Sequence, residues 1–223
     1  MPRTARAIIA SYPHHVVQRG NNKQDVFFDG EDRAKYCALL EKYSEKWKAP
    51  ILAYCLMTNH VHLLVKPKED ASLYKMMQGV SLCYTQFVNR KYGRTGRLWE
   101  SRYHSCIVDR DVYLWAVARY IETNPVRARM VEKAEDYPYS SAPSHVAGVK
   151  DGLLGEELFD KAQRKDYRAF IRTAVSAGDM DRVRYHTRSG RPLGKDAFVS
   201  RLEKKTGRDF SRKPGRPRGK GGE

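Results

Sequence analysis

Hydrophobic and polar residues recur along this chain with two spacings, one typical of helices and one typical of strands. Apolar residues at every third or fourth position predict helices over 31–48, 71–92 and 110–124. Short apolar runs bounded by turn-forming residues predict strands over 6–19, 51–57, 60–66 and 98–108. The order is strand, helix, strand, strand, helix, strand, helix. We therefore expect an α+β fold of the ferredoxin-like type, an antiparallel sheet with helices on one face.

Turn formers and prolines set the expected ends of these elements. Only Thr58 and Asn59 separate the second strand from the third, so these two strands should be antiparallel neighbours. Pro13 predicts a bend or an edge position within the first strand. Pro125 disfavours helical geometry at Asn124, so the third helix should end there.

Two histidines on the third predicted strand are the first candidates for chemistry. Side chains two positions apart on a strand point to the same face, so His60 and His62 lie side by side. Val61 and Leu63 would then face the core on the other side. Two adjacent imidazoles can chelate a divalent metal, although Mg²⁺ or Mn²⁺ needs about six ligands, mostly oxygens. The pair is also compatible with an incidental His-x-His on an exposed strand.

The helix predicted over 110–124 carries a tyrosine and an asparagine that complete this hypothesis. Tyr120 and Asn124 are four residues apart and therefore stack on one helix face. The Asn124 amide oxygen is a candidate third metal ligand, and Tyr120 is a candidate nucleophile towards a phosphate polarised by the metal. Tyr113 lies two turns earlier on the same face and is the alternative nucleophile. A core tyrosine and a helix-ending asparagine are the simpler interpretations.

Four segments together resemble a known family. They are NHVHLLV at 59–65, RYIETNPVRARMV at 119–131, VVQRGNNKQDVFF at 16–28 and GRLWESRYHSCIV at 96–108. In their order along the chain, these segments are similar to the REP-associated tyrosine transposases, which belong to the single-tyrosine HUH transposase superfamily. The resemblance covers roughly residues 5–140, and it depends on the order of the four segments more than on any one of them.

The resemblance implies an activity and a role for each candidate residue. His60, His62 and Asn124 would hold Mg²⁺ or Mn²⁺, and Tyr120 would be the nucleophile of the Tyr-x-x-x-Asn-Pro pattern. The implied enzyme is a metal-dependent single-stranded DNA endonuclease and strand transferase that acts on DNA hairpins through a 5′-phosphotyrosine intermediate. Two alternatives remain open: a non-catalytic regulator that binds hairpin DNA, and an RNA-binding protein.

The charge of the chain agrees with a nucleic-acid partner. The formal net charge is +16 in 223 residues, which favours a polyanionic partner. No apolar run approaches the roughly 20 residues that a membrane-spanning helix needs, so we expect no membrane partner and a cytoplasmic, nucleoid-associated protein. A monomer and a homodimer are equally compatible with the sequence.

Two clusters are candidates for DNA contacts. A polar loop can read splayed bases and phosphates, and basic residues interleaved with aromatic ones suit single strands. The first cluster follows the first strand and comprises Gln18, Arg19, Asn21 and Asn22. The second comprises Arg94, Arg97, Trp99 and Arg102.

The last third of the chain differs in composition from the rest. Residues 150–223 contain 20 lysines and arginines and 11 acidic residues. The excess of basic residues in this segment is more than half of the net charge of the chain. We expect a catalytic domain over 1–140, a basic and partly helical extension over 141–210, and a disordered tail over 211–223. Arg216 and Arg218 in this tail belong to an AT-hook-like segment that would lie in a DNA minor groove.

Overall fold

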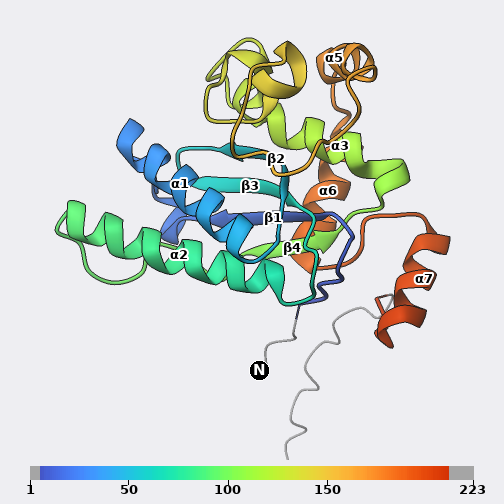
Figure 1. Ribbon diagram of the computed structural model, residues 1–223, viewed down its shortest axis with the longest axis horizontal. Coiled ribbons are helices and arrows are strands. Elements are labelled where there is room, and N and C mark those ends of the chain that lie inside the picture. Colours follow the sequence, from blue (N-terminus) through green and yellow to red (C-terminus); the bar gives the residue numbers. More distant parts are fainter. Residues whose placement is uncertain (1–5, 211–223) are drawn as a thin grey trace, which may run out of the picture.

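The computed structural model describes residues 6–210, and in it four antiparallel strands form a single sheet (Figure 1). The spatial order is β2-β3-β1-β4. The bounds are β1 His14–Arg19, β2 Ile51–Leu56, β3 His60–Val65 and β4 His104–Ile107. Strands β2 and β3 are hairpin neighbours, and β1 pairs with both β3 and β4. This order is that of a ferredoxin-like sheet, so the predicted α+β class is confirmed.

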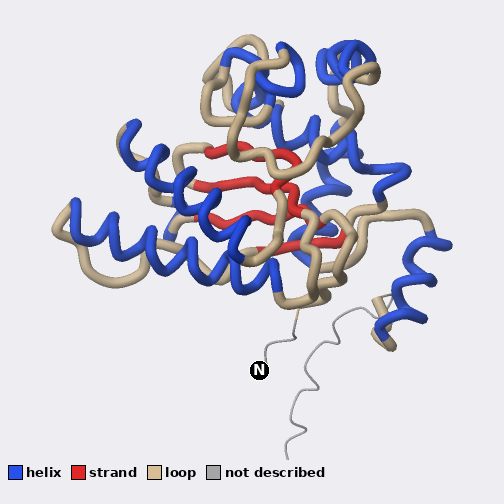
Figure 2. Tube along the Cα trace, in the orientation of Figure 1, coloured by secondary structure: helices blue, strands red, loops and turns tan. Residues whose placement is uncertain are grey.

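Helices α1 (Gly30–Lys46) and α2 (Ser72–Lys91) cover one face of the sheet (Figure 2). The face is built by alternate strand residues, because successive side chains of a strand point to opposite sides. Val61, Leu63 and Val65 of β3 are fully buried there, in one hydrophobic cluster with residues of both helices. The sequence predicted this arrangement, in which Val61 and Leu63 face the core on the side opposite His60 and His62.

The opposite face is also covered, which corrects the expectation of helices on one face only. Helix α3 (Arg110–Glu122) contacts β2 and β3, and α6 (Ala177–Ser189) contacts β4 and β1. Ala53 and Leu64 are buried in a second cluster on this side. The sheet therefore lies between two helical layers. The residues of β3 that point away from the first cluster are enclosed by the second layer.

Two predicted strands are shorter than expected. Residues 6–13 do not pair in the sheet, and β1 begins directly after Pro13. Residues 98–103 also lie outside β4, and they meet the end of β1 only in an isolated antiparallel bridge between Gly20 and Trp99. In this bridge the Asn21 amide donates to the Leu98 carbonyl and the Glu100 amide to the Arg19 carbonyl. The apolar run at 98–99 enters the first core instead of extending a strand.

Helix α3 ends close to the predicted position. Thr123 follows its last residue, and a short helix α4 (Asn124–Arg127) starts with Pro125 in its first turn. Proline is accepted there because the first amides of a helix have no partner within it. The chain therefore turns at the site that Pro125 predicted, and Asn124 lies at the junction of the two helices.

The segment predicted as a basic extension contains α5 (Arg164–Arg172), α6 and α7 (Asp196–Thr206). It is joined to α3 by buried polar contacts around Glu122, which is fully enclosed. The Glu122 carboxylate accepts hydrogen bonds from Ser141, His145 and Tyr167. Residues on both sides of position 140 therefore share one hydrophobic core. The boundary expected there marks a change in composition along the chain.

The outer edge of β2 is occupied by later parts of the chain. The Leu56 amide donates to the Tyr139 carbonyl at 2.9 Å, and the Ser141 amide donates to the Tyr54 carbonyl at 3.0 Å. At the start of the strand, the Gly155 amide donates to the Ile51 carbonyl at 3.1 Å. Within residues 6–210, no helix is long and apolar enough to cross a membrane. The AT-hook-like tail with Arg216 and Arg218 lies outside the described residues.

Candidate active site

Strand β3 places His60 and His62 on the face that α3 covers. Their ring centroids are 5.0 Å apart, as expected for side chains two positions apart on a strand. His62 is buried with 4% of its surface exposed, whereas His60 is half-buried at the end of the strand. The predicted pairing of the two imidazoles on one face is therefore present, in a site that is far more enclosed than an exposed strand.

Each imidazole has one ring nitrogen engaged in a hydrogen bond. His60 Nδ1 lies 2.6 Å from Asn59 Oδ1, and His62 Nδ1 lies 3.0 Å from Nε2 of His15. An amide oxygen only accepts, so His60 donates through Nδ1 and keeps its Nε2 lone pair. Metal-binding histidines are commonly oriented by such a bond to the nitrogen that does not bind the metal.

Burial keeps both histidines neutral near pH 7. Together with the positive charges of Arg19 and Arg127, it lowers the pKa of His60 to about 4. Burial also holds the pKa of His62 well below its ordinary value. Neutral imidazole is the form that coordinates a metal ion, so both side chains are in the state that a ligand requires.

His15 on β1 is a third histidine of the site that the sequence did not single out. Its ring is nearly parallel to that of His62, with centroids 5.2 Å apart and an interplanar angle of 8°. Burial lowers the pKa of His15 to about 3, so it is also neutral. The sequence signal was the pair His14-His15 on a strand, but only the β1–β3 register shows which of the two faces His62.

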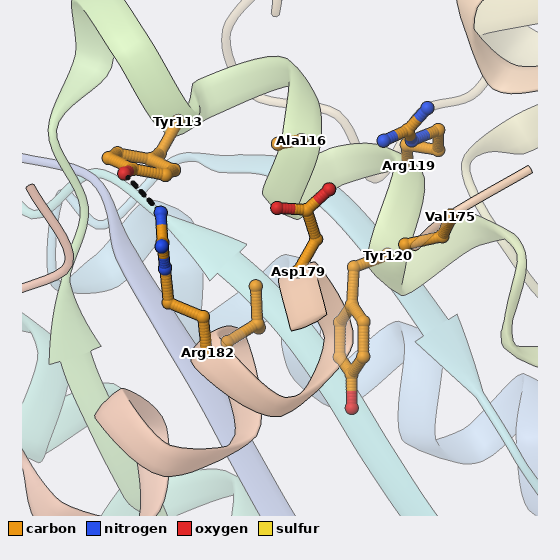
Figure 3. Close-up of a pocket in the computed structure, with 8 residues that line it drawn as sticks. Tyr113, Ala116, Arg119, Tyr120, Val175, Asp179 and Arg182 are labelled. Atoms are coloured by element: carbon orange, nitrogen blue, oxygen red, sulfur yellow. Dashed lines mark hydrogen bonds between the residues drawn. The ribbon is translucent and has the colours of Figure 1, made fainter. Parts of the chain in front are cut away.

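Tyr120 extends from α3 over the paired histidines. Its ring meets His62 edge to face at 5.6 Å and His15 at 5.7 Å between centroids. The side chain is 5% exposed. Tyr113 on the same helix points elsewhere, and its hydroxyl accepts a hydrogen bond of 3.0 Å from Arg182 (Figure 3). Within residues 6–210, Tyr120 is thus the candidate nucleophile whose ring contacts the rings of His15 and His62.

Two arginines lie at Tyr120. The Arg127 guanidinium is 4.6 Å from the centre of the Tyr120 ring. Arg184 of α6 also lies close to Tyr120, and its interaction with the tyrosine raises the pKa of Arg184 above its ordinary value. Burial lowers the pKa of Arg127, and the nearby Arg184 lowers it further. The surroundings of the tyrosine are thus positively charged, which suits an anionic ligand.

Asn124 is engaged in ending α3. Its Nδ2 donates to the carbonyls of Tyr120 at 3.0 Å and Ile121 at 3.1 Å, and its Oδ1 accepts from Arg127 at 2.7 Å. A carbonyl oxygen has two lone pairs, so one remains on Oδ1. In the described chain, no group of three or more His, Cys, Asp or Glu residues that could hold a metal ion is present. The role of Asn124 as a third metal ligand stays a prediction.

The model of one protein family matches residues 9–124, just over half of the chain, and its description is "Transposase IS200 like". The chain belongs to the IS200-like transposase family. The matched region of this IS200-like transposase runs from the residues before β1 to Asn124, and it therefore includes the three histidines and Tyr120. Helices α5, α6 and α7 lie beyond it.

Two known proteins are similar to this IS200-like transposase. A putative REP-associated tyrosine transposase of Haemophilus influenzae is 28% identical over 109 residues. That alignment covers 44% of this chain and 61% of the relative, so the chain spans about three fifths of the relative's length. The solved structure of a REP-associated tyrosine transposase bound to a REP hairpin aligns with a TM-score of 0.57 and 16% identity, over 72% of this chain and 94% of that one. The resemblance inferred from the four sequence segments is confirmed.

The fold places the residues predicted to contact DNA in two different environments. Gln18 and Trp99 are buried, with 3% and 7% of their surfaces exposed, which contradicts the prediction that they meet DNA. Gln18 accepts a hydrogen bond from Ser81 of α2, and Trp99 packs on Tyr36 and Tyr84. The other predicted contacts are exposed or half-buried, and they stay predictions: Arg19, Asn21, Asn22, Arg94, Arg97 and Arg102.

Proposed function

We propose that this IS200-like transposase cleaves and rejoins single-stranded DNA beside a hairpin, with Tyr120 as the nucleophile. The observation that carries the proposal is the position of Tyr120, whose ring contacts His62 and which lies close to the guanidinium of Arg184. A nucleophile for phosphoryl transfer needs a nearby electrophilic group and positive charge where negative charge develops. The membership of a transposase family supports DNA as the substrate.

The residues present fit a divalent metal ion. His60 and His62 are neutral, and the ring nitrogen of each that points away from its hydrogen-bond partner is available to bind. Asn124 can add its remaining Oδ1 lone pair, and phosphate and water oxygens would complete the shell that Mg²⁺ or Mn²⁺ prefers. A bound ion would withdraw charge from the scissile phosphate and make its phosphorus more electrophilic.

The chain's own residues account for the exchange of bonds. The Tyr120 oxygen loses its proton to solvent and forms a bond to phosphorus, while the bond from phosphorus to the 3′ oxygen breaks. The departing strand takes up a proton and leaves as a free 3′-OH, and the downstream strand stays attached through a 5′-phosphotyrosine. Attack by a 3′-OH reverses these steps, so rejoining needs no further source of energy. Arg184 and Arg127 hold the phosphate at the tyrosine during both steps.

The test is the polarity of a covalent adduct. A single-stranded DNA hairpin with a 3′ extension is incubated with the protein and Mn²⁺, and the products are separated on a denaturing gel. A label at the 3′ end should migrate with the protein, whereas a label at the 5′ end should appear in a shorter, protein-free strand. His60→Ala should give neither product.

The opposite labelling pattern, with the 5′ label on the protein, would contradict a 5′-phosphotyrosine. Tight binding without any adduct, over a panel of hairpins and flanking sequences, would support the non-catalytic regulator. Preference for RNA hairpins of the same sequence would support the RNA-binding alternative.

Arg184→Gln should weaken both DNA binding and adduct formation. Removal of one phosphate contact should reduce the slope of log affinity against log salt by about 0.7 for a single strand. The adduct should form about 100-fold more slowly, because one preorganised donor at the reacting phosphate is lost. Arg201→Gln on α7 removes the same charge from an exposed position and is the matched control. Equal effects of the two variants would show that Arg184 acts only through net charge.

A further inference from the structure

A chain of hydrogen bonds connects α6 to His62 through the interior of the protein. His62 Nδ1 lies 3.0 Å from His15 Nε2, and His15 Nδ1 lies 2.7 Å from the hydroxyl of Thr187 on α6. The Thr187 hydroxyl in turn donates to the Val183 carbonyl at 2.8 Å. His15, His62 and Thr187 are each at most 4% exposed, so water does not compete for these bonds.

The carbonyl at the end of the chain determines the direction of every bond in it. A carbonyl oxygen only accepts, so the one proton of the Thr187 hydroxyl points to Val183. The hydroxyl oxygen must then accept the proton on His15 Nδ1. A neutral His15 with its proton on Nδ1 has a lone pair on Nε2, which accepts the proton on His62 Nδ1. His62 is left with its lone pair on Nε2.

The other neighbour of the Thr187 hydroxyl does not change this direction. Cys106 Sγ lies 3.4 Å from Thr187 Oγ1. Because the Thr187 proton points to Val183, this thiol can only donate to the hydroxyl oxygen, and His15 Nδ1 remains the other donor to Thr187. Only a Thr187 proton directed at His15 would reverse the chain, and the bond to Val183 would then be lost. Within residues 6–210, neither histidine has a carboxylate as a hydrogen-bond partner, which disfavours an imidazolium in this buried place.

We propose that Thr187 and His15 are positioning residues that hold His62 in the tautomer with the proton on Nδ1 and direct its Nε2 lone pair at the metal ion. The inference rests on the proposed function, since it concerns the same metal site. It makes α6 a part of that site, although α6 lies outside the region shared with the family model. Partners that orient a metal-binding histidine commonly contribute 10- to 100-fold in metal affinity.

The experiment compares Thr187→Val with Thr206→Val in the full-length protein. Thr206 on α7 donates to the Leu202 carbonyl at 2.8 Å, the same bond within a helix that Thr187 makes to Val183. Thr187→Val is expected to weaken Mn²⁺ binding, measured by electron paramagnetic resonance without DNA, by about 10- to 100-fold. Thr206→Val and Thr187→Ser should bind as the wild type does, since serine keeps the hydroxyl.

A second measurement does not require the metal. Nitrogen-15 NMR of the histidine rings in the metal-free protein should show His62 with its proton on Nδ1, and Thr187→Val should shift it towards a mixture of tautomers. A proton on Nε2 of His62 in the wild type would overturn the proposal. An unchanged tautomer and unchanged Mn²⁺ affinity in Thr187→Val would also overturn it, with the proposed function intact. The expected tautomer in a protein that forms no DNA adduct would support this hydrogen-bond chain while the proposed function fails.

Discussion

Tyr120→Phe is expected to abolish the covalent adduct with DNA and to leave the fold and the metal site intact. The phenylalanine ring keeps the edge-to-face contacts with His15 and His62, so the change removes only the hydroxyl and its interaction with Arg184. Loss of the nucleophile in enzymes with covalent intermediates lowers the rate by roughly 10⁴- to 10⁶-fold. On the denaturing gel, the protein-linked 3′ label should fall below detection.

Tyr113→Phe is the matched control for this experiment. It removes a hydroxyl from the same helix and breaks one hydrogen bond to an arginine, Arg182, whereas the ring contacts with His15 and His62 are those of Tyr120. Its adduct yield should remain close to that of the wild type. An adduct that persists in Tyr120→Phe and disappears in Tyr113→Phe would move the nucleophile to Tyr113. Unchanged Mn²⁺ affinity in both variants would show that the metal site is undisturbed.

Glu122→Ala is expected to have the largest effect on stability. The carboxylate is fully buried, and it accepts hydrogen bonds at 2.5 Å from Ser141, 2.5 Å from His145 and 2.7 Å from Tyr167. Its removal leaves the buried donors of His145 and Tyr167 without this acceptor, while Ser141 keeps only its bond of 3.3 Å to the Tyr54 carbonyl, and it opens a cavity between α3 and the later segments. Removing one partner from a buried, hydrogen-bonded charged group typically lowers the free energy of unfolding by about 3–5 kcal/mol.

Chemical denaturation measured by circular dichroism tests this expectation. The control is Glu132→Ala at an exposed position, where the free energy of unfolding should change by no more than about 0.5 kcal/mol. Glu122→Gln should be intermediate, because an amide keeps one acceptor oxygen and presents a donor to one of the three partners. Equal stability of Glu122→Ala and Glu132→Ala would show that the later segments are not held to α3 through this carboxylate.

The elements with regular spacing were predictable because their side chains face one environment along their whole length. Helices α1 and α2 each bury one apolar stripe, and β2 and β3 are short apolar runs joined by a two-residue turn. The run at 98–99 was misassigned to a strand because apolar residues mark burial without specifying the element. Coverage of the second face was missed for a related reason: the helices that provide part of it come from the basic last third of the chain.

The candidate site was predictable only where its residues are close in sequence or belong to the family pattern. The spacing of two residues places His60 beside His62, and the Tyr-x-x-x-Asn-Pro pattern identifies Tyr120. In contrast, Thr187 and His15 are 172 positions apart, and nothing local distinguishes this threonine from any other on a helix. Trp99 and Gln18 were assigned to DNA by composition, but their burial depends on helices of the first layer that composition does not reveal.

The covered edge of β2 has a consequence for how copies of this protein can meet. A free outer edge presents a row of unpaired amides and carbonyls, to which the strand of another molecule can add, and such addition underlies many dimers and aggregates. Here the amide of Leu56 and the carbonyls of Ile51 and Tyr54 already bond to Tyr139, Gly155 and Ser141. Two molecules cannot merge their sheets through β2 unless these segments first detach, so a homodimer would have to form through another surface.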